Sequence, residues 1–115
     1  MKDKSIYSVS ISPSKVKGSK YSAVFRNKDN KKINTLNFGA KGYRDYTLMN
    51  NPKSEYYLKD EDKRNDVKRR YIARHARMGE NWSVPNTKGS LSRWVLWEKT
   101  NINDAINAYK KRFKL

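Results

Sequence analysis

The sequence predicts an α+β fold, in which a small antiparallel three-stranded sheet packs against about three helices as a single basic domain spanning residues 1–115. Two observations predict this class. Alternating apolar and polar residues, which are typical of strands, occur before residue 40, whereas apolar residues at helical spacing occur from residue 60 onward. A chain of 115 residues suits one ordinary domain, and its 12% aromatic content offers large side chains for a core.

The strands are predicted in the N-terminal part of the chain. Residues 7–11 alternate apolar side chains with Ser, which places the apolar ones, Tyr7 included, on one face of a strand. Residues 21–26 and 33–38 continue the pattern on either side of residues 27–31, a polar run that is typical of a hairpin turn. The three segments therefore predict a meander with one face toward solvent and the other covered by helices.

The longest helix is predicted over residues 60–78. Asp60 and its two acidic neighbours place negative charge at the start of this helix, where the helix dipole favours it, and Gly79 is a natural terminator. The stretch before it, residues 43–48, is aromatic and is expected to be partly extended.

Two shorter helices are predicted after residue 86. Thr87 or Ser90 is the expected cap of the first, and Thr100 or Asn101 is the expected cap of the second. The last helix carries apolar residues at the 3.6-residue spacing of one buried face: Ile102, Ala105, Ile106, Tyr109 and Phe113.

The charge of the chain indicates the class of partner. Its 27 Lys and Arg outnumber its 11 Asp and Glu, which gives a formal net charge of +16. A surface of this kind repels itself, so we expect a polyanionic partner, and nucleic acid is the commonest one. The first twenty residues contain no apolar block of the signal-peptide type, and no stretch reaches the roughly 18 apolar residues of a membrane span. An unsecreted protein without a membrane span is therefore expected.

Two groups of cations are candidate nucleic-acid contacts, and neither is expected to need a cofactor or a metal ion. On a helical wheel, the first forms a narrow stripe on the predicted helix over residues 60–78: Lys63, Arg70, Arg74 and Arg77, with Arg69 beside it. The second lies at the C-terminus: Lys110, Lys111, Arg112 and Lys114. The alternative role of the second group is to complement the dipole of the last helix. The hairpin loop supplies a third, weaker surface: Arg26, Lys28, Lys31 and Lys32.

Catalysis is not the preferred interpretation of any residue. The absence of Cys excludes thiol catalysis, and His75 is the only imidazole. His75 lies on the apolar side of its predicted helix, so a packed and hydrogen-bonded His is favoured over a catalytic one. The acids that a nuclease would need as metal ligands, such as Asp45 and Glu80, show no diagnostic spacing.

The aromatic residues and one glycine-rich turn have two interpretations each. The three Trp residues stack on unpaired bases or form the core, and the scarcity of aliphatic residues favours the core. Trp97 is the exception, because it lies off the apolar face of its predicted helix and is expected to be exposed or to form a protein interface. Residues 39–42 offer backbone N–H groups to a phosphate, but a plain turn is the favoured interpretation.

Four segments add a family resemblance: residues 38–47 (FGAKGYRDYT), 69–75 (RRYIARH), 80–82 (ENW) and 89–97 (GSLSRWVLW). Together they resemble a family of short basic proteins encoded by large nucleocytoplasmic DNA viruses, and the likeness covers roughly residues 36–115. The family has no assigned activity, so the resemblance transfers no catalytic or binding residue. It implies a virion or an intracellular viral factory as the setting, where a small cationic protein would condense genomic DNA.

The expected function is non-enzymatic binding of nucleic acid, DNA in preference to RNA, by phosphate neutralisation largely without sequence specificity, for genome binding or packaging. The first alternative is a structural virion component, a minor capsid or internal protein that docks on acidic capsid proteins or membrane surfaces through its cations and an exposed Trp97. The second alternative is a metal-dependent nuclease that uses His75.

Overall fold

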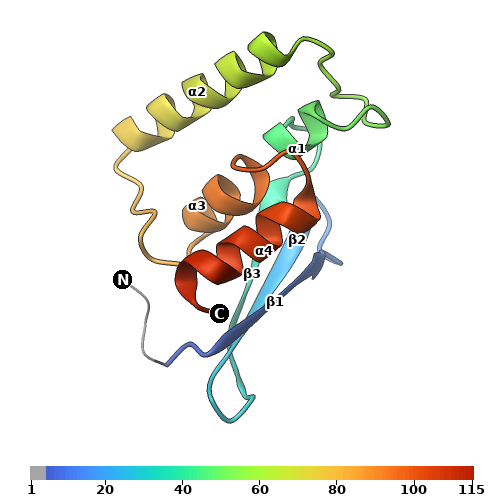
Figure 1. Cartoon of the computed structure of the whole chain (residues 1–115). Helices are drawn as coiled ribbons and strands as arrows, with labels where there is room; N and C mark the ends of the chain where they lie inside the picture. Colours follow the sequence, from blue (N-terminus) through green and yellow to red (C-terminus); the bar gives the residue numbers. More distant parts are fainter. Residues whose placement is uncertain (1–4) are drawn as a thin grey trace.

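The structure, a computed structural model, describes residues 5–115. Its elements confirm the predicted α+β class, with a three-stranded sheet followed by helices (Figure 1). In chain order they are β1 (Ser8–Pro13), β2 (Ser19–Arg26), β3 (Lys32–Ala40), α1 (Tyr46–Met49), α2 (Glu61–Arg77), α3 (Lys88–Leu91), the π-helix η1 (Ser92–Leu96) and α4 (Ile102–Phe113). None of the helices within the described range is long and apolar enough to cross a membrane.

The sheet is the predicted antiparallel meander, in the order β1-β2-β3. The turn between β2 and β3 is closed by Asn27, whose Oδ1 accepts hydrogen bonds from the backbone N–H groups of Asp29 and Lys31, both at 3.0 Å. The first strand begins one residue later than predicted. Ile6 takes the buried position at this end of the sheet, whereas Tyr7, which was predicted on the apolar face of the strand, is 61% exposed.

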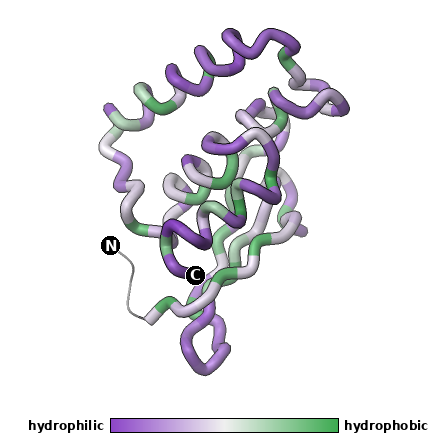
Figure 2. Tube along the Cα trace, viewed as in Figure 1, coloured by the Kyte–Doolittle hydropathy of each residue, from purple (hydrophilic) through white to green (hydrophobic). Residues whose placement is uncertain are grey.

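One face of the sheet is covered by α3, η1 and α4, which lie across it in Figure 1. Figure 2 shows the hydrophobic segments concentrated between these helices and the sheet, whereas α2 is largely hydrophilic. The caps are the predicted ones, because the side chains of Thr87 and Asn101 accept hydrogen bonds from the backbone N–H groups of Ser90 and Asp104. The buried residues of this main core are Ile6, Val9, Ala23, Phe25, Phe38, Leu91, Val95, Leu96, Tyr109 and Phe113.

Helix α2 lies apart from the sheet and packs on a second, smaller cluster of buried residues: Tyr46, Met49 and Val67. Asp60 caps its start and Gly79, at φ +78°, follows its end, as predicted. Met78, at that end, is 67% exposed.

Trp97 joins the two cores, so the prediction that it is exposed is wrong. Its partly buried ring packs against both clusters, and its centroid lies 4.2 Å from that of Tyr71 on α2. The reason is the π-helix that precedes it. A π-helix rotates less per residue than an α-helix, so a wheel drawn at α-helical spacing assigns Trp97 to the wrong face.

Candidate nucleic-acid interface

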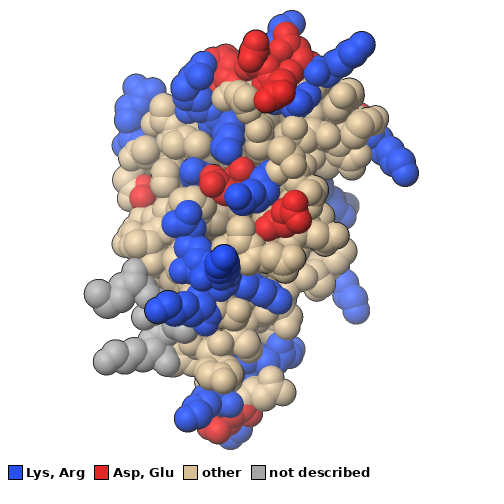
Figure 3. Space-filling view, in the orientation of Figure 1, with Lys and Arg blue, Asp and Glu red and all other residues tan. Residues whose placement is uncertain are grey.

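The predicted stripe on α2 is exposed along its whole length: Lys63, Arg69, Arg70, Arg74 and Arg77. Asp66 neutralises part of it, because its carboxylate pairs with the guanidinium groups of Arg69 and Arg70. Lys63, Arg74 and Arg77 form no ion pair within residues 5–115. In Figure 3, Lys and Arg side chains gather at the C-terminal end of α2 and acidic side chains gather at its N-terminal end. The C-terminal half of α2 is therefore the more positive one.

The second predicted group surrounds the end of α4, where Figure 3 also shows a concentration of cations. Lys110, Lys111 and Arg112 lie in the last turn and Lys114 adopts a left-handed conformation just beyond it. The guanidinium carbon of Arg112 lies 3.6 Å from the centroid of the Trp94 ring, which gives this residue a packing role. No residue of this group lines the cleft formed by α2, so the structure does not bring the two predicted groups into one pocket.

A cleft of about 450 Å³ separates α2 from the body of the protein and continues into a hollow of about 220 Å³. One wall is α2, which contributes Arg74 and His75, and the other is the turn between β3 and α1, which contributes Tyr43 and Arg44. Helix α3, with Lys88, and η1 close its base. We call this cavity the α2 cleft.

The cations of the α2 cleft come from distant parts of the chain. Arg44, Arg74 and Lys88 line it, and none of them forms an ion pair in the described part of the chain. Arg70 lines the adjoining hollow. Of the residues predicted from the sequence, the cleft and hollow therefore contain Arg70 and Arg74, whereas Arg44 and Lys88 were missed.

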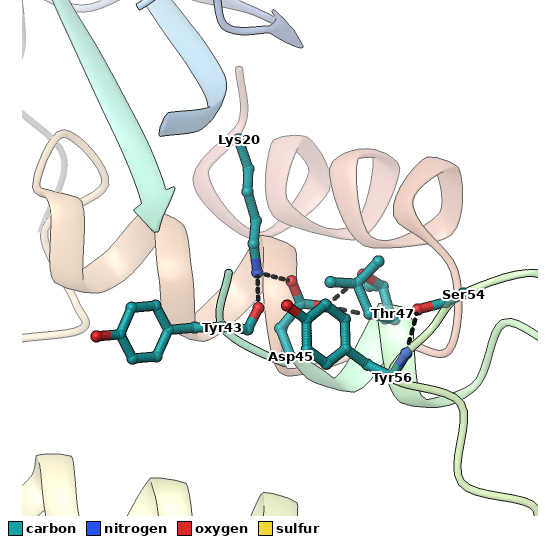
Figure 4. Close-up of polar contacts among 7 residues, drawn as sticks. Lys20, Tyr43, Asp45, Thr47, Ser54 and Tyr56 are labelled. Atoms are coloured by element: carbon teal, nitrogen blue, oxygen red, sulfur yellow. Dashed lines mark hydrogen bonds and ion pairs between the residues drawn. The ribbon is translucent and has the colours of Figure 1, made fainter. Parts of the chain in front are cut away.

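Asp45, one of two acids in the cleft, is fully engaged by the protein itself (Figure 4). Its side chain is buried, and it accepts hydrogen bonds from Lys20 Nζ at 2.8 Å, Thr47 Oγ1 at 2.6 Å and the Leu48 N–H at 3.0 Å. Lys20 Nζ also donates to the backbone carbonyl of Tyr43 at 2.7 Å. These bonds cap α1 and hold the turn between β3 and α1 in place.

Glu80, the other acid, is held in the same way. Its carboxylate accepts a hydrogen bond from Trp82 Nε1 at 2.9 Å and lies 2.7 Å from His75 Nδ1. A Cβ atom at Gly89 would lie 3.0 Å from Glu80 Oε1, so Gly89 allows the carboxylate to pack on α3. Both acids of the cleft are thus satisfied internally, and its cations are left to face an outside ligand.

His75 is packed and hydrogen-bonded, as the sequence favoured. Its ring stacks on Tyr71, with the centroids 4.3 Å apart, in addition to its bond with Glu80. A metal-dependent nuclease needs several ligands around the metal ion. Among residues 5–115 no group of three or more His, Asp or Glu side chains is placed to hold one. The nuclease alternative gains no support from this arrangement.

Aromatic rings line the same cleft. Tyr43 is 70% exposed at its rim, whereas Tyr71 is buried in its wall beside Trp97. Burial raises the pKa of the Tyr71 phenol far above its ordinary value of 10.0, with a further contribution from Glu80, so the phenol stays neutral at physiological pH. The cleft therefore combines unpaired cations with one accessible ring and a neutral aromatic wall.

Four stretches of the sequence meet at the α2 cleft. Residues 38–47, 69–75, 80–82 and 89–97 each contribute to its lining. In the glycine-rich turn within residues 38–47, the N–H of Lys41 is already engaged, because it donates to the carbonyl of Gly18 at 2.9 Å. No family model, no curated protein and no solved structure matches the chain.

Proposed function

We propose that this protein binds nucleic acid without catalysing a reaction, by neutralising phosphates largely without regard to sequence. The proposal is carried by the exposed cations on the C-terminal half of α2, which face solvent and the α2 cleft. Arg74 and Arg77 are the most important of them, because neither has an acidic partner in the described chain. DNA is the proposed partner in preference to RNA. On the motif resemblance alone, the proposed setting is a virion or a viral factory, where binding would serve to hold or package the genome.

Few of the cations are paired with acidic side chains within residues 5–115. Asp66 pairs with Arg69 and Arg70, and Glu98 pairs with Lys68 and Arg93. With 27 Lys and Arg against 11 Asp and Glu, internal pairing leaves most of the positive charge unbalanced. A rigid helix that presents Arg side chains at regular spacing is suited to a row of phosphates, since each guanidinium offers paired donors.

The test is the salt dependence of binding, measured by fluorescence anisotropy with labelled duplex DNA, single-stranded DNA and RNA. If six or more cations engage phosphates, duplex affinity falls by about three orders of magnitude or more between 50 and 200 mM salt. Two unrelated duplex sequences should give the same curve. A flat salt response would remove the proposal.

The two alternative functions, capsid docking and nuclease activity, can each be distinguished from nucleic-acid binding. Docking on acidic capsid proteins relied on an exposed Trp97, and that ring is partly buried between the two cores.

Nuclease activity is checked by incubating a supercoiled plasmid with the protein and Mg²⁺ or Mn²⁺, with His75→Ala as control. The proposed function predicts an intact plasmid in both samples, and cleavage that depends on His75 would contradict it.

A further inference from the structure

We propose that the α2 cleft holds an unpaired nucleotide of a single strand, with its phosphate between Arg44, Arg74 and Lys88 and its base stacked on Tyr43. This inference rests on the proposed function and adds a preference for unpaired strands. It is carried by the joint presence of a cavity, uncompensated cations and an exposed ring at one place.

The size of the cavity favours one nucleotide over a duplex. Its volume of about 450 Å³ lies within the range of sites that enclose small ligands. A duplex, whose major groove alone is about 12 Å wide, cannot enter such a cavity and has to lie on the exposed face of α2 instead. A single strand has no such restriction, because its bases and phosphates rotate independently.

The charges of the cleft match a phosphodiester. Four Lys or Arg residues line it against two acids, and those acids are already bonded to Lys20, Thr47, His75 and Trp82. Arg44 and Arg74 lie on opposite walls, on the β3–α1 turn and on α2, and Lys88 lies at the base. A phosphate that enters the cleft therefore meets cations on three sides.

Tyr43 supplies the stacking surface. Its side chain is 70% exposed although its backbone is fixed, because its carbonyl accepts a hydrogen bond from Lys20 Nζ at 2.7 Å. Figure 4 shows the ring directed away from the Lys20–Asp45 pair. An exposed aromatic ring on a fixed backbone beside a cationic cavity is the arrangement by which proteins stack single-stranded bases without reading sequence.

The π-helix η1 is the second unusual feature of this cavity. It contributes Ser92 and Leu96 to the lining, and π-helical turns inside helices occur frequently at functional sites. Gly39, at φ +77°, packs so closely on this helix that a Cβ atom there would lie 2.9 Å from Leu96 Cδ1. The base of the cleft is thereby held against the end of β3.

The experiment compares two labelled strands of about ten nucleotides, a length within the site sizes of single-strand-binding domains. One is oligothymidylate and the other is an abasic strand of the same length and charge. Wild-type protein should bind oligothymidylate about fivefold to 150-fold more tightly than the abasic strand, since this is the usual effect of one stacked base. Tyr43→Ala should remove that difference and leave duplex affinity within about twofold of the wild type.

Tyr7→Ala is the matched control, because Tyr7 is also a largely exposed tyrosine but lies before β1, outside the cleft. It should bind all strands as the wild type does. The double substitution Arg44→Gln/Lys88→Gln should weaken oligothymidylate and the abasic strand alike. Thermal unfolding of each variant confirms that the protein remains folded.

Equal binding of the two strands by the wild type, or no effect of Tyr43→Ala on their difference, overturns the cleft assignment. If duplex binding remains salt-dependent in that case, the proposed function stands and only this inference fails. If no nucleic acid binds in a salt-dependent manner, both fail.

Discussion

The most informative substitution replaces the three arginines of the C-terminal part of α2, Arg70, Arg74 and Arg77, with Gln. All three are exposed, and only Arg70 has an acidic partner, Asp66, at 3.1 Å. Exposed ion pairs of this kind are weak, so Arg70 counts as available for a phosphate. Asp66 keeps its second partner, Arg69, after the substitution. The folded state should therefore change little, while three phosphate contacts are lost.

The magnitude follows from counterion release. Each contact contributes about 0.9 to the slope of log affinity against log salt concentration, so the slope should fall by about 2.7. Between 50 and 200 mM salt, the loss of affinity for duplex DNA should then be about 40-fold smaller for the variant than for the wild type. Fluorescence anisotropy with one labelled duplex at four or more salt concentrations gives both slopes.

The matched control removes three exposed Lys residues near the β2–β3 turn, Lys28, Lys31 and Lys32, at the end of the sheet far from the α2 cleft. It lowers the net charge by the same amount. If phosphates are met mainly on α2, the control should change the slope by less than about 1. Equal slopes for the two variants would show that only net charge matters and that α2 is not a defined contact surface.

The remaining predictions concern the scaffold. Gly39→Ala should lower the melting temperature more than Gly42→Ala. Both residues have positive φ, but an added Cβ atom would meet Leu96 only at position 39. Equal effects would argue against close packing there. Asp45→Ala should reduce the free energy of unfolding in urea by about 3 kcal/mol or more, because it leaves the ammonium of Lys20 without its acidic partner, and a loss below about 1 kcal/mol would contradict the role assigned to this pair. Burial raises the pKa of Tyr71 in the folded state, so an unfolded chain ionises this phenol first and stability is lost as pH rises above 10.0. Between about pH 9 and 11, the melting temperature of Tyr71→Phe should therefore fall less than that of the wild type. Equal falls for the two proteins would contradict this assignment.

Much of the fold was predictable because it depends on local signals. The alternation of β2, the capping residues of α2 and α4 and the 3.6-residue spacing of α4 each act over a few neighbouring positions. Helix α1 was missed because it has four residues, and its cap, Asp45, is placed by a contact with Lys20 on β2. Such a contact between segments 25 residues apart is invisible to a local pattern.

The candidate site was predictable only in part, for the same reason. Arg70 and Arg74 stand out because they repeat along one helix, so a wheel finds them. Arg44 and Lys88 lie on other segments, each among ordinary neighbours, and only the folded chain brings them opposite Arg74. The burial of Trp97 was not predicted because no pattern in the sequence indicates a π-helix.

In the proposed complex, cations on α2 and around the α2 cleft meet the phosphates of a nucleic acid. A nuclear magnetic resonance titration of ¹⁵N-labelled protein with unlabelled single-stranded DNA measures this directly, residue by residue. The account predicts shift changes for the C-terminal half of α2 and for the turn that carries Tyr43 and Arg44, and their disappearance at about 0.5 M salt. Changes confined to the β2–β3 turn, or none in low salt, would contradict it.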